Sequence, residues 1–286
     1  MPTLYVVATP IGNLGDMTPR AIETLRKVAL IAAEDTRVTR KLLSAFDIHT
    51  PLTSCHEHNE TEKAQGIVSR MLADGIDIAV TTDAGTPCIS DPGSILAGIA
   101  IQNGIEVIAI PGASAIIAAL SVSGFALEEF TFVGFLPRAK NELKAKLLEI
   151  TGRTKIAVAY ESPHRVIALL EGIEAALPET LVSASCDLTK KFELTLRGGV
   201  SEVLRQLREN PKAEKGEYCL VLQWRNAPAP EEKESALSLE AQLFDGVVNG
   251  LSLRESMDGL VARGQRKNAV YAASLRVKDM LKSGNL

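Results

Sequence analysis

Short apolar runs alternate with helical patterns through the first 121 residues, and this alternation limits the fold more than any other feature. The runs are apolar almost throughout, and they lie at 3–9, 29–34, 76–82 and 105–111. Such strands are typical of parallel sheets that are buried on both faces. Parallel strands need long crossover connections, which are usually helices. We therefore expect an N-terminal α/β domain over 1–121 with a mostly parallel sheet.

A different pattern begins after residue 124, because strand-type segments now outnumber helical ones. The expected strands are 130–135, 155–160, 181–186, 191–198 and 216–224, and the expected helices are 140–150, 164–177 and 201–210. Several of these strands alternate apolar with polar residues, which is typical of antiparallel or mixed sheets. The pattern predicts a second α/β domain over 122–226 with a mixed sheet. We interpret Phe130, Phe132 and Phe135 as core residues rather than as a base-stacking platform.

The last part of the chain is helical and basic. A Pro-, Ala- and charge-rich stretch at 225–235 is typical of a linker, and the helical patterns that follow predict a small helix-turn-helix-like domain over 235–286. Residues 251–286 carry seven Lys or Arg and three Asp or Glu, a balance of +4 in a chain of net charge −4. This asymmetry indicates contact with a polyanion. Within the tail, the predicted RNA-binding residues are Arg263, Arg266 and Lys267.

Neither targeting nor metal chemistry is indicated. The N-terminus lacks the basic and apolar segments of a signal peptide, and no run approaches the ~18 apolar residues of a membrane span. The four cysteines are scattered, as expected of free thiols in a reducing compartment. We therefore predict a cytoplasmic protein with no membrane span. Cys55, His56 and His58 lie close together, but no distant Cys/His pair completes a zinc site, and no metal is predicted.

Polar loops rich in Gly and Pro follow four of the predicted strands. They read TPIGNLGD (9–16), EDTR (34–37), DAGTPCISDPG (83–93) and PGASA (111–115). Ligands of open parallel sheets bind at the carboxyl ends of the strands, so we expect the four loops to meet at one ligand-binding rim. Asp91 is interpreted as the N-cap of the next helix, with Pro92 at its first position. Neither a G-x-G-x-x-G fingerprint nor a P-loop is present.

Seven motifs occur in the order TPIGNLGDMTPRA, AAEDTR, TTDAGTPCISDPG, PGASA, YESPHR, LTKKFE and KGEY. Over nearly the whole chain they resemble the tetrapyrrole-methylase-fold family of S-adenosylmethionine-dependent methyltransferases. DAGTPCISDPG with EDTR is similar to the branch of that family that acts on 16S rRNA. The resemblance implies a homodimer, two α/β domains with S-adenosylmethionine in the cleft between them, and 2′-O-methylation of a cytidine ribose in the decoding region.

The resemblance also implies which residues bind the cofactor. The family's P-x-G motif matches 10–12, and its G-D-P loop matches 85–87, where Thr86 replaces the usual Asp. Because this departure removes a carboxylate, we expect the loop to bind through backbone groups. Carried over residue by residue, the predicted cofactor-binding residues are Pro10, Ala84, Gly85, Thr86, Ile89, Ser114, Ala115, Tyr160 and Glu161.

A ribose hydroxyl is a weak nucleophile, so a base, or a cation near the developing alkoxide, would assist methyl transfer. Glu34 ends an apolar run at the rim, and Lys191 lies in LTKKFE; these two are the predicted catalytic residues. Asp35, Lys190, Glu193 and Glu217 belong to the same set of candidates. Phosphates of RNA are predicted to contact Arg37, Arg138 and Arg165.

Two other functions stay open on the sequence. The same fold would serve a methylase of a tetrapyrrole-like or other small molecule, and a non-catalytic RNA-binding protein of ribosome assembly could keep the same loops. The basic tail and the EDTR and LTKKFE matches argue against the first, and the intact rim argues against the second. The sequence identifies neither the general base nor whether free rRNA or the assembled 30S subunit is the substrate.

Overall fold

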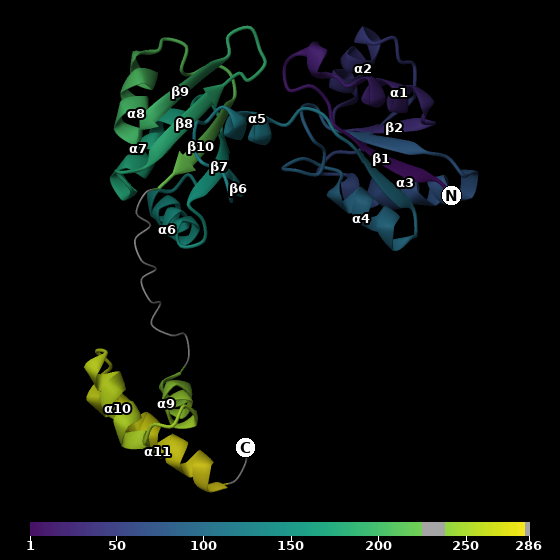
Figure 1. Ribbon diagram of the computed structural model, residues 1–286. Helices are drawn as coiled ribbons and strands as arrows, with labels where there is room; N and C mark the ends of the chain where they lie inside the picture. Colours follow the sequence, from purple (N-terminus) through teal and green to yellow (C-terminus); the bar gives the residue numbers. More distant parts are fainter. Residues whose placement is uncertain (225–237, 284–286) are drawn as a thin grey trace. The chain divides into compact units, whose positions relative to one another are not determined.

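The computed structural model describes residues 1–224 and 238–283. The chain divides into two compact units, Met1–Ala227 and Pro228–Leu286. The larger unit contains two five-stranded sheets (Figure 1). The predicted linker at 225–235 lies outside the described residues, and the predicted domain boundaries stay predictions.

The first sheet is built from the amino-terminal alternation. Its strands pair only in parallel, in the order β3-β2-β4-β1-β5, which confirms the predicted parallel sheet. The strands are β1 (Thr3–Val7), β2 (Leu30–Ala33), β3 (Leu52–Ser54), β4 (Ile78–Thr81) and β5 (Glu106–Ile110). The connecting helices are α1 (Pro19–Lys27), α2 (Thr36–Ala45), α3 (Glu60–Asp74) and α4 (Ser94–Gln102), preceded by a short 3-10 helix at Leu14–Asp16. The apolar pattern does not predict β3, because its residues are only half-buried.

Helices cover both faces of this sheet (Figure 1). Successive residues of a strand point to opposite faces. Ile31 accordingly packs in one core cluster with Leu25 of α1 and Leu43 of α2. Its neighbour Ala32 packs in another with Met71 of α3 and residues of α4. Both faces are therefore buried, which explains why the strand segments are apolar throughout.

The start of α4 differs from the prediction. Gly93 is the N-cap, so the assignment of Asp91 to that position is wrong. The side chain that satisfies the first amides of α4 comes instead from α3. Glu60 is 4% exposed, and its Oε1 accepts hydrogen bonds of 2.8–3.1 Å from the N–H groups of Gly93, Ile95 and Leu96. A cap that comes from another helix leaves no signal beside the helix that it caps, whereas α1 has a local N-cap, the side chain of Thr18.

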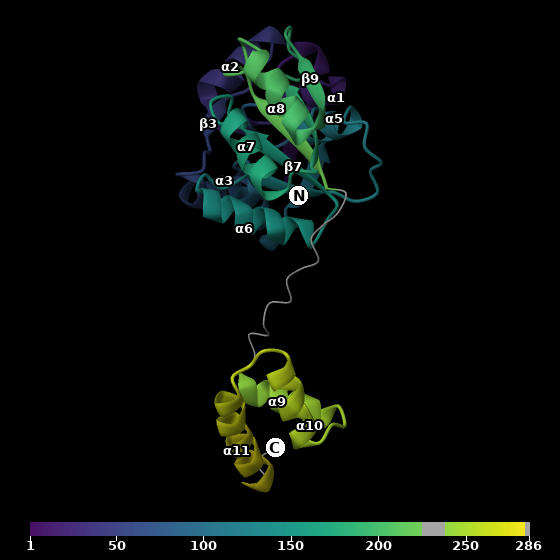
Figure 2. The ribbon, with the colours of Figure 1, turned by 90° about the vertical axis from the view of Figure 1, so that its left-hand side faces the viewer.

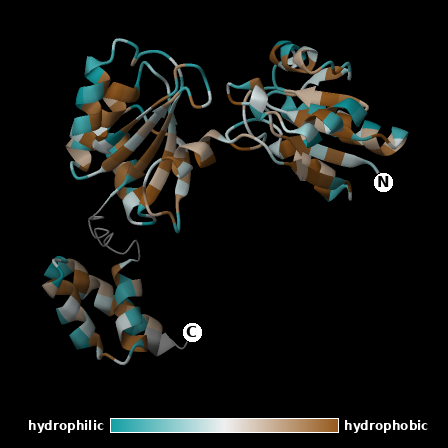
Figure 3. Ribbon diagram, turned by 45° about the horizontal axis from the view of Figure 1, so that its top comes forward, coloured by the Kyte–Doolittle hydropathy of each residue, from teal (hydrophilic) through white to brown (hydrophobic). Residues whose placement is uncertain are grey.

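The second sheet has the order β6-β7-β10-β8-β9. β6 is parallel to β7 and the other neighbours are antiparallel, which confirms the predicted mixed sheet. The strands are β6 (Thr131–Phe135), β7 (Ile156–Glu161), β8 (Leu181–Cys186), β9 (Leu194–Gly199) and β10 (Tyr218–Gln223). The associated helices are α5 (Ala115–Ser121), α6 (Lys140–Thr151), α7 (Val166–Ala176) and α8 (Val200–Glu209). Hydrophobic residues recur along the strands of both sheets (Figure 3).

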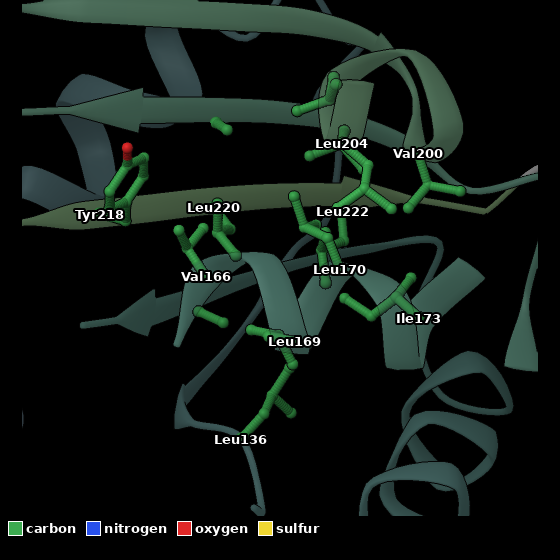
Figure 4. Packing of buried hydrophobic residues seen from close by; sticks show 14 of the residues in the cluster. Leu136, Val166, Leu169, Leu170, Ile173, Val200, Leu204, Tyr218, Leu220 and Leu222 are labelled. Atoms are coloured by element: carbon green, nitrogen blue, oxygen red, sulfur yellow. The ribbon is translucent and has the colours of Figure 1, made fainter. Parts of the chain in front are cut away.

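One face of the second sheet is covered by α6, α7 and α8, which lie together in front of it in Figure 2. Leu169 and Ile173 of α7 pack in one buried cluster with Leu220 and Leu222 of β10 (Figure 4). The opposite face is covered by α5, whose Leu120 packs in a separate cluster. Although α5 precedes the predicted boundary at residue 121, its apolar residues therefore belong to the core of the second sheet.

The three phenylalanines near β6 differ from one another. Phe132 is half-buried and packs against the cluster beneath α5, as predicted. Phe130 is 42% exposed and Phe135 is 61% exposed, so the assignment of these two to the core is wrong. The alternation of strand side chains between two faces places Phe132 inward, and a register shift between β6 and β7 separates it from Phe135.

The described part of the C-terminal unit is helical, as predicted. It comprises α9 (Leu239–Val248), α10 (Leu253–Ala262) and α11 (Lys267–Ser283). Its core is small and contains Leu243, Leu260, Val270, Ala273 and Val277. Reciprocal hydrogen bonds between Ser252 and Glu255 form a capping box at the start of α10. None of the helices in the described ranges is both long enough and apolar enough to span a membrane.

We expect Glu60→Ala to lower the free energy of unfolding by about 2–3 kcal/mol, because three N–H groups at the start of α4 lose their carboxylate acceptor. Glu62→Ala, two residues further along α3 at an exposed position, is the matched control and is expected to change the free energy of unfolding by about 0.5 kcal/mol or less. Urea unfolding followed by circular dichroism measures both. Equal stabilities of the two variants would contradict the role given to Glu60.

Candidate active site

Four loops meet at the carboxyl edge of the first sheet. β2, β4, β1 and β5 are consecutive neighbours and all run in the same direction. The loops that follow them, 34–37, 83–93, 9–16 and 111–115, therefore leave the same edge, as expected for a ligand-binding rim of an open parallel sheet.

Backbone hydrogen bonds join the loops after β1 and β4. The N–H of Thr9 donates to the carbonyl of Gly85 (2.8 Å), and the N–H of Gly85 donates to the carbonyl of Thr9 (3.1 Å). Gly85 has φ +91°, a conformation that residues with a Cβ rarely adopt, and a Cβ there would lie 3.4 Å from Cγ2 of Ile11. Glycine thus allows the two backbones to pair at the centre of the rim.

Two of the predicted cofactor residues also hold the rim together. The hydroxyl of Thr86 donates to the carbonyl of Ala113 (3.3 Å), which ties the loop after β4 to the loop after β5. Ser114 is the N-cap of α5 and accepts from the N–H of Ile117 (3.5 Å). Thr86, which replaces the Asp that the resemblance implies, is therefore a link between loops. Among the other predicted residues, Ala84 and Ile89 are exposed at the rim, and Pro10 and Ala115 are half-buried.

Carboxylates gather where β2 and β4 end. Glu34 Oε2 accepts hydrogen bonds from the hydroxyl of Thr82 (2.6 Å) and the N–H of Asp83 (3.1 Å). The carboxylate of Asp83 in turn accepts from the N–H of Asp35 (3.1 Å). Predicted catalytic residue Glu34 thus joins two rim loops. Among the residues that the structure describes, no group of three or more His, Cys, Asp or Glu is arranged to hold a metal ion.

Burial and mutual repulsion change the acidity of these groups. Burial is the largest cause that raises the pKa of Asp91, to about 6; the nearby hydroxyl of Thr82 opposes it, and the charges of Glu34 and Asp83 add to it. Burial also raises the pKa of Asp83. By contrast, the side-chain hydrogen bond from Arg37 lowers the pKa of Asp35. Asp91 is therefore the rim carboxyl with a pKa near neutrality.

The loop after β4 also approaches the second sheet. A Cβ added at Gly134 of β6 would lie 3.9 Å from the hydroxyl oxygen of Ser90. Near this point, the ring of Tyr160 packs edge-on against Phe132, with centroids 5.1 Å apart, and lies 6.0 Å from that of Phe135. Burial is the largest cause that raises the pKa of Tyr160, and the charges of Cys219 and Asp91 add smaller contributions.

Glu161, which follows Tyr160, faces inward. Its side chain is 0% exposed, and its Oε2 lies 3.2 Å from Nη2 of Arg165. Oε1 accepts from the N–H of Ser162 (2.7 Å). Arg165 also donates to the carbonyl of Leu136 (3.2 Å). Glu161, predicted to bind the cofactor, and Arg165, predicted to bind RNA, therefore form a partly buried ion pair at the end of β7.

The two lysines of LTKKFE have different environments. Lys190 Nζ pairs with Asp187 (3.0 Å) and Glu217 (2.8 Å), and its stem lies against Gly12 of the first rim loop. Lys191, the lysine predicted to be catalytic, is exposed, and its Nζ lies 5.7 Å from the ring centroid of Phe192. The sequence could not predict that these adjacent lysines have different partners, because the partners of Lys190 come from distant parts of the chain.

The predicted RNA-binding residues lie on both units of the chain. Arg37 pairs with Asp35 (2.6 Å) beside the rim, and Arg138 is exposed after β6. Arg263, Arg266 and Lys267 are exposed in the C-terminal unit, at the turn between α10 and α11. Gly264 has φ +95° in that turn, and the helix-turn-helix-like character of the unit stays a prediction.

Comparison with known families gives the larger context of these loops. Residues 3–204 match the family model for tetrapyrrole (corrin/porphyrin) methylases.

The chain belongs to the tetrapyrrole methylase family.

Other members of the family match the chain over almost its full length. A protein from Halalkalibacterium halodurans is 46% identical over 94% of this chain and 93% of its own length. One from Neisseria meningitidis serogroup A is 40% identical over 97% of this chain and 94% of its own length. Both are named ribosomal RNA small subunit methyltransferase I.

Solved structures of other proteins share the fold at low sequence identity. The uroporphyrin-III C-methyltransferase of Thermus thermophilus, complexed with S-adenyl homocysteine, is 14% identical with a TM-score of 0.52 and covers 77% of this chain and 97% of its own. Diphthine synthase is 12% identical with a TM-score of 0.59 and covers 79% of this chain and 91% of its own. The fold common to them is therefore shorter than this chain.

We expect Asp91→Asn to stabilise the protein by about 1–2 kcal/mol at pH 7.5, after allowance for solvent screening. Because folding raises the pKa of Asp91 from 3.8 to about 6, the wild-type protein loses stability as the pH rises through that interval. The gain from Asn should therefore shrink as the pH falls below 6 and vanish below about 4. Urea unfolding at pH 7.5 and pH 4 measures it, and an equal gain at both values would contradict the raised pKa.

Proposed function

We propose that this chain transfers a methyl group from S-adenosylmethionine to the 2′-hydroxyl of a cytidine ribose in 16S rRNA, in the decoding region of the small subunit. The observation that carries the proposal is the extent of the match. A relative named as a small-subunit rRNA methyltransferase is similar over 97% of the chain, so the similarity includes most of the C-terminal helical unit. The solved structures compared above cover 77% and 79% of it.

The rim suits the cofactor in three respects. Gly85, at positive φ, leaves room where a side chain would meet Ile11, and the neighbouring loop residues are small or apolar. S-adenosylmethionine presents an uncharged adenosine and a cationic sulfonium. The carboxylates of Asp83 and Asp91 favour a cation nearby. We propose that Pro10, Ala84 and Ile89 contact the cofactor directly, and that Thr86 and Ser114 shape its loops.

Bound S-adenosylmethionine would supply a methyl group on an excellent leaving group, so the protein's task is mainly to position the acceptor. The chain's own residues would hold the ribose 2′-oxygen in line with the methyl group, and one of them would accept the hydroxyl proton. Glu34 is the predicted base. A general base works best when its pKa lies near the working pH, and the pKa of Asp91, about 6, favours Asp91 as a second candidate. Lys191 remains a prediction for alkoxide stabilisation.

The proposed function also implies an RNA partner and a cytoplasmic location. The RNA is contacted on the larger unit by Arg37 and Arg138 and on the tail by Arg263, Arg266 and Lys267. The 30S subunit or its free rRNA is the partner, and the cytoplasm is where ribosomes of bacteria are assembled. We also propose a homodimer, which analytical ultracentrifugation would test.

Incubation with methyl-labelled S-adenosylmethionine and unmethylated 30S subunits, free 16S rRNA or a porphyrinoid tests the function. We expect label in RNA at one cytidine 2′-O position. Gly85→Val is expected to lose labelling at least a hundredfold, because a β-branched side chain neither adopts φ +91° nor leaves room beside Ile11. Circular dichroism checks that the variant is folded, and calorimetry measures its cofactor affinity.

Label in the porphyrinoid and not in RNA would favour the small-molecule methylase instead. Tight RNA binding without label in any substrate would favour the non-catalytic alternative.

Removal of the compact unit 228–286 is expected to weaken 30S or rRNA binding about tenfold or more and to leave cofactor affinity within a factor of two, because the rim lies wholly in Met1–Ala227. Filter binding and calorimetry measure the two affinities. The matched full-length control carries neutral residues in place of Arg263, Arg266 and Lys267. Unchanged RNA affinity in the truncated protein would refute the role of the tail.

A further inference from the structure

The turn between β8 and β9 lies beside the rim and is held there by Lys190. The stem of Lys190 occupies the space where a Cβ of Gly12 would be. Its Nζ is fixed by Asp187 at 3.0 Å and Glu217 at 2.8 Å. Glu193 closes the turn by accepting from the N–H of Thr189 (2.7 Å). The residues between these anchors, Lys191 and Phe192, are therefore presented at a fixed place next to the loop after β1.

Phe192 is an exposed aromatic residue between two cations. Its side chain is 65% exposed, although a phenyl ring gains free energy by leaving water. The Nζ of Lys212, from the segment before β10, lies 4.4 Å from the ring centroid. The Nζ of Lys191 lies 5.7 Å from it. Both lie within the distance at which a cation is attracted to an aromatic face.

The two cations have no acidic partner in the protein as described. Within residues 1–224 and 238–283, neither Lys191 nor Lys212 forms an ion pair with a carboxylate, whereas Lys190 forms two. A phenyl ring is a weak partner for an ammonium group in water. The positive charge over the ring is therefore available to a stronger, anionic partner.

One class of ligand satisfies both the ring and the cations. An unpaired nucleotide has a flat base that stacks on an aromatic ring and a phosphate that attracts lysine, and sequence-tolerant single-strand binding uses this combination. We propose that Phe192 and Lys212, with Lys191, form a platform that binds an unpaired nucleotide of the substrate RNA beside the methyl-transfer site. This inference rests on the proposed function for its RNA, but it concerns residues outside the loops that hold the cofactor.

Binding would exchange the partners of the platform. The ammonium group of Lys212 lies over the ring in the free protein, on a face where a base could stack. A phosphate attracts that ammonium more strongly than the ring does, so the lysine moves to the phosphate and the base takes its place on Phe192. The ring and the lysine then contribute differently: loss of the ring removes stacking, and loss of the lysine removes a phosphate contact.

The test measures binding of a fluorescein-labelled 12-nucleotide single-stranded RNA to the full chain by anisotropy at several salt concentrations. Phe192→Ala is expected to raise the Kd about tenfold with the salt dependence unchanged. Phe192→Trp is expected to retain wild-type affinity. Lys212→Ala is expected to lower the slope of log Kd against log salt by about 0.7. Matched controls are Phe130→Ala, another exposed aromatic, and Lys144→Ala on α6, both with wild-type binding.

Two outcomes would overturn the platform: wild-type affinity of Phe192→Ala, or an unaltered salt slope in Lys212→Ala. If Phe192→Ala binds RNA with the wild-type Kd but sediments differently from wild type, the ring instead covers a second copy of the chain. Failure of the proposed function appears separately, as absence of methyl label in 30S subunits with the wild-type protein. If wild type labels RNA and Phe192→Ala does so with an unchanged KM, only the platform fails.

Discussion

The pair of backbone hydrogen bonds between Thr9 and Gly85 is the contact on which the rim depends. β1 and β4 are adjacent in the sheet, and this pair of hydrogen bonds joins the two loops that follow them, which are far apart in the sequence. Only a residue that tolerates φ +91° can close it without strain. The hydroxyl of Thr86 then extends the connection to the loop after β5. The ligand-binding edge is therefore a set of loops joined to one another, rather than separate turns at strand ends.

The ligand-binding edge also contains a half-buried carboxyl group and strained backbone, which are unfavourable and depend on contacts from the rest of the domain. Asp91 is half-buried near other carboxylates, and Cys88 and Ser90 adopt positive φ although neither is glycine. Such strain persists where surrounding contacts over-determine it, and it is common at functional sites. Glu60 provides one of those contacts, because it holds the start of α4 directly after the strained loop. Stability supplied by α3 thus permits an arrangement that the loop alone would not keep.

The second sheet and the C-terminal unit contribute different surfaces to an RNA-modifying enzyme. The second sheet brings Tyr160 and the turn anchored by Lys190 to the rim, and its exposed ring at Phe192 faces solvent between cations. The C-terminal unit adds positive charge on a separate small core. Because electrostatic contacts to phosphate give affinity with little dependence on sequence, such surfaces can hold RNA while the rim determines the chemistry. The net charge of the whole chain is negative, so it gives no sign of these local positive surfaces.

The sequence by itself determined the layers of both sheets, since periodicity of apolar residues decides which faces must be buried, and it identified the four loops because Gly, Pro and small polar residues interrupt the apolar runs. Tertiary structure alone decided the rest. Glu60 caps a helix in place of Asp91, Phe135 is exposed where Phe132 is packed, and the stem of Lys190 lies against Gly12 of the first rim loop. Each depends on residues distant in the chain, and local pattern carries no information about contacts of that kind.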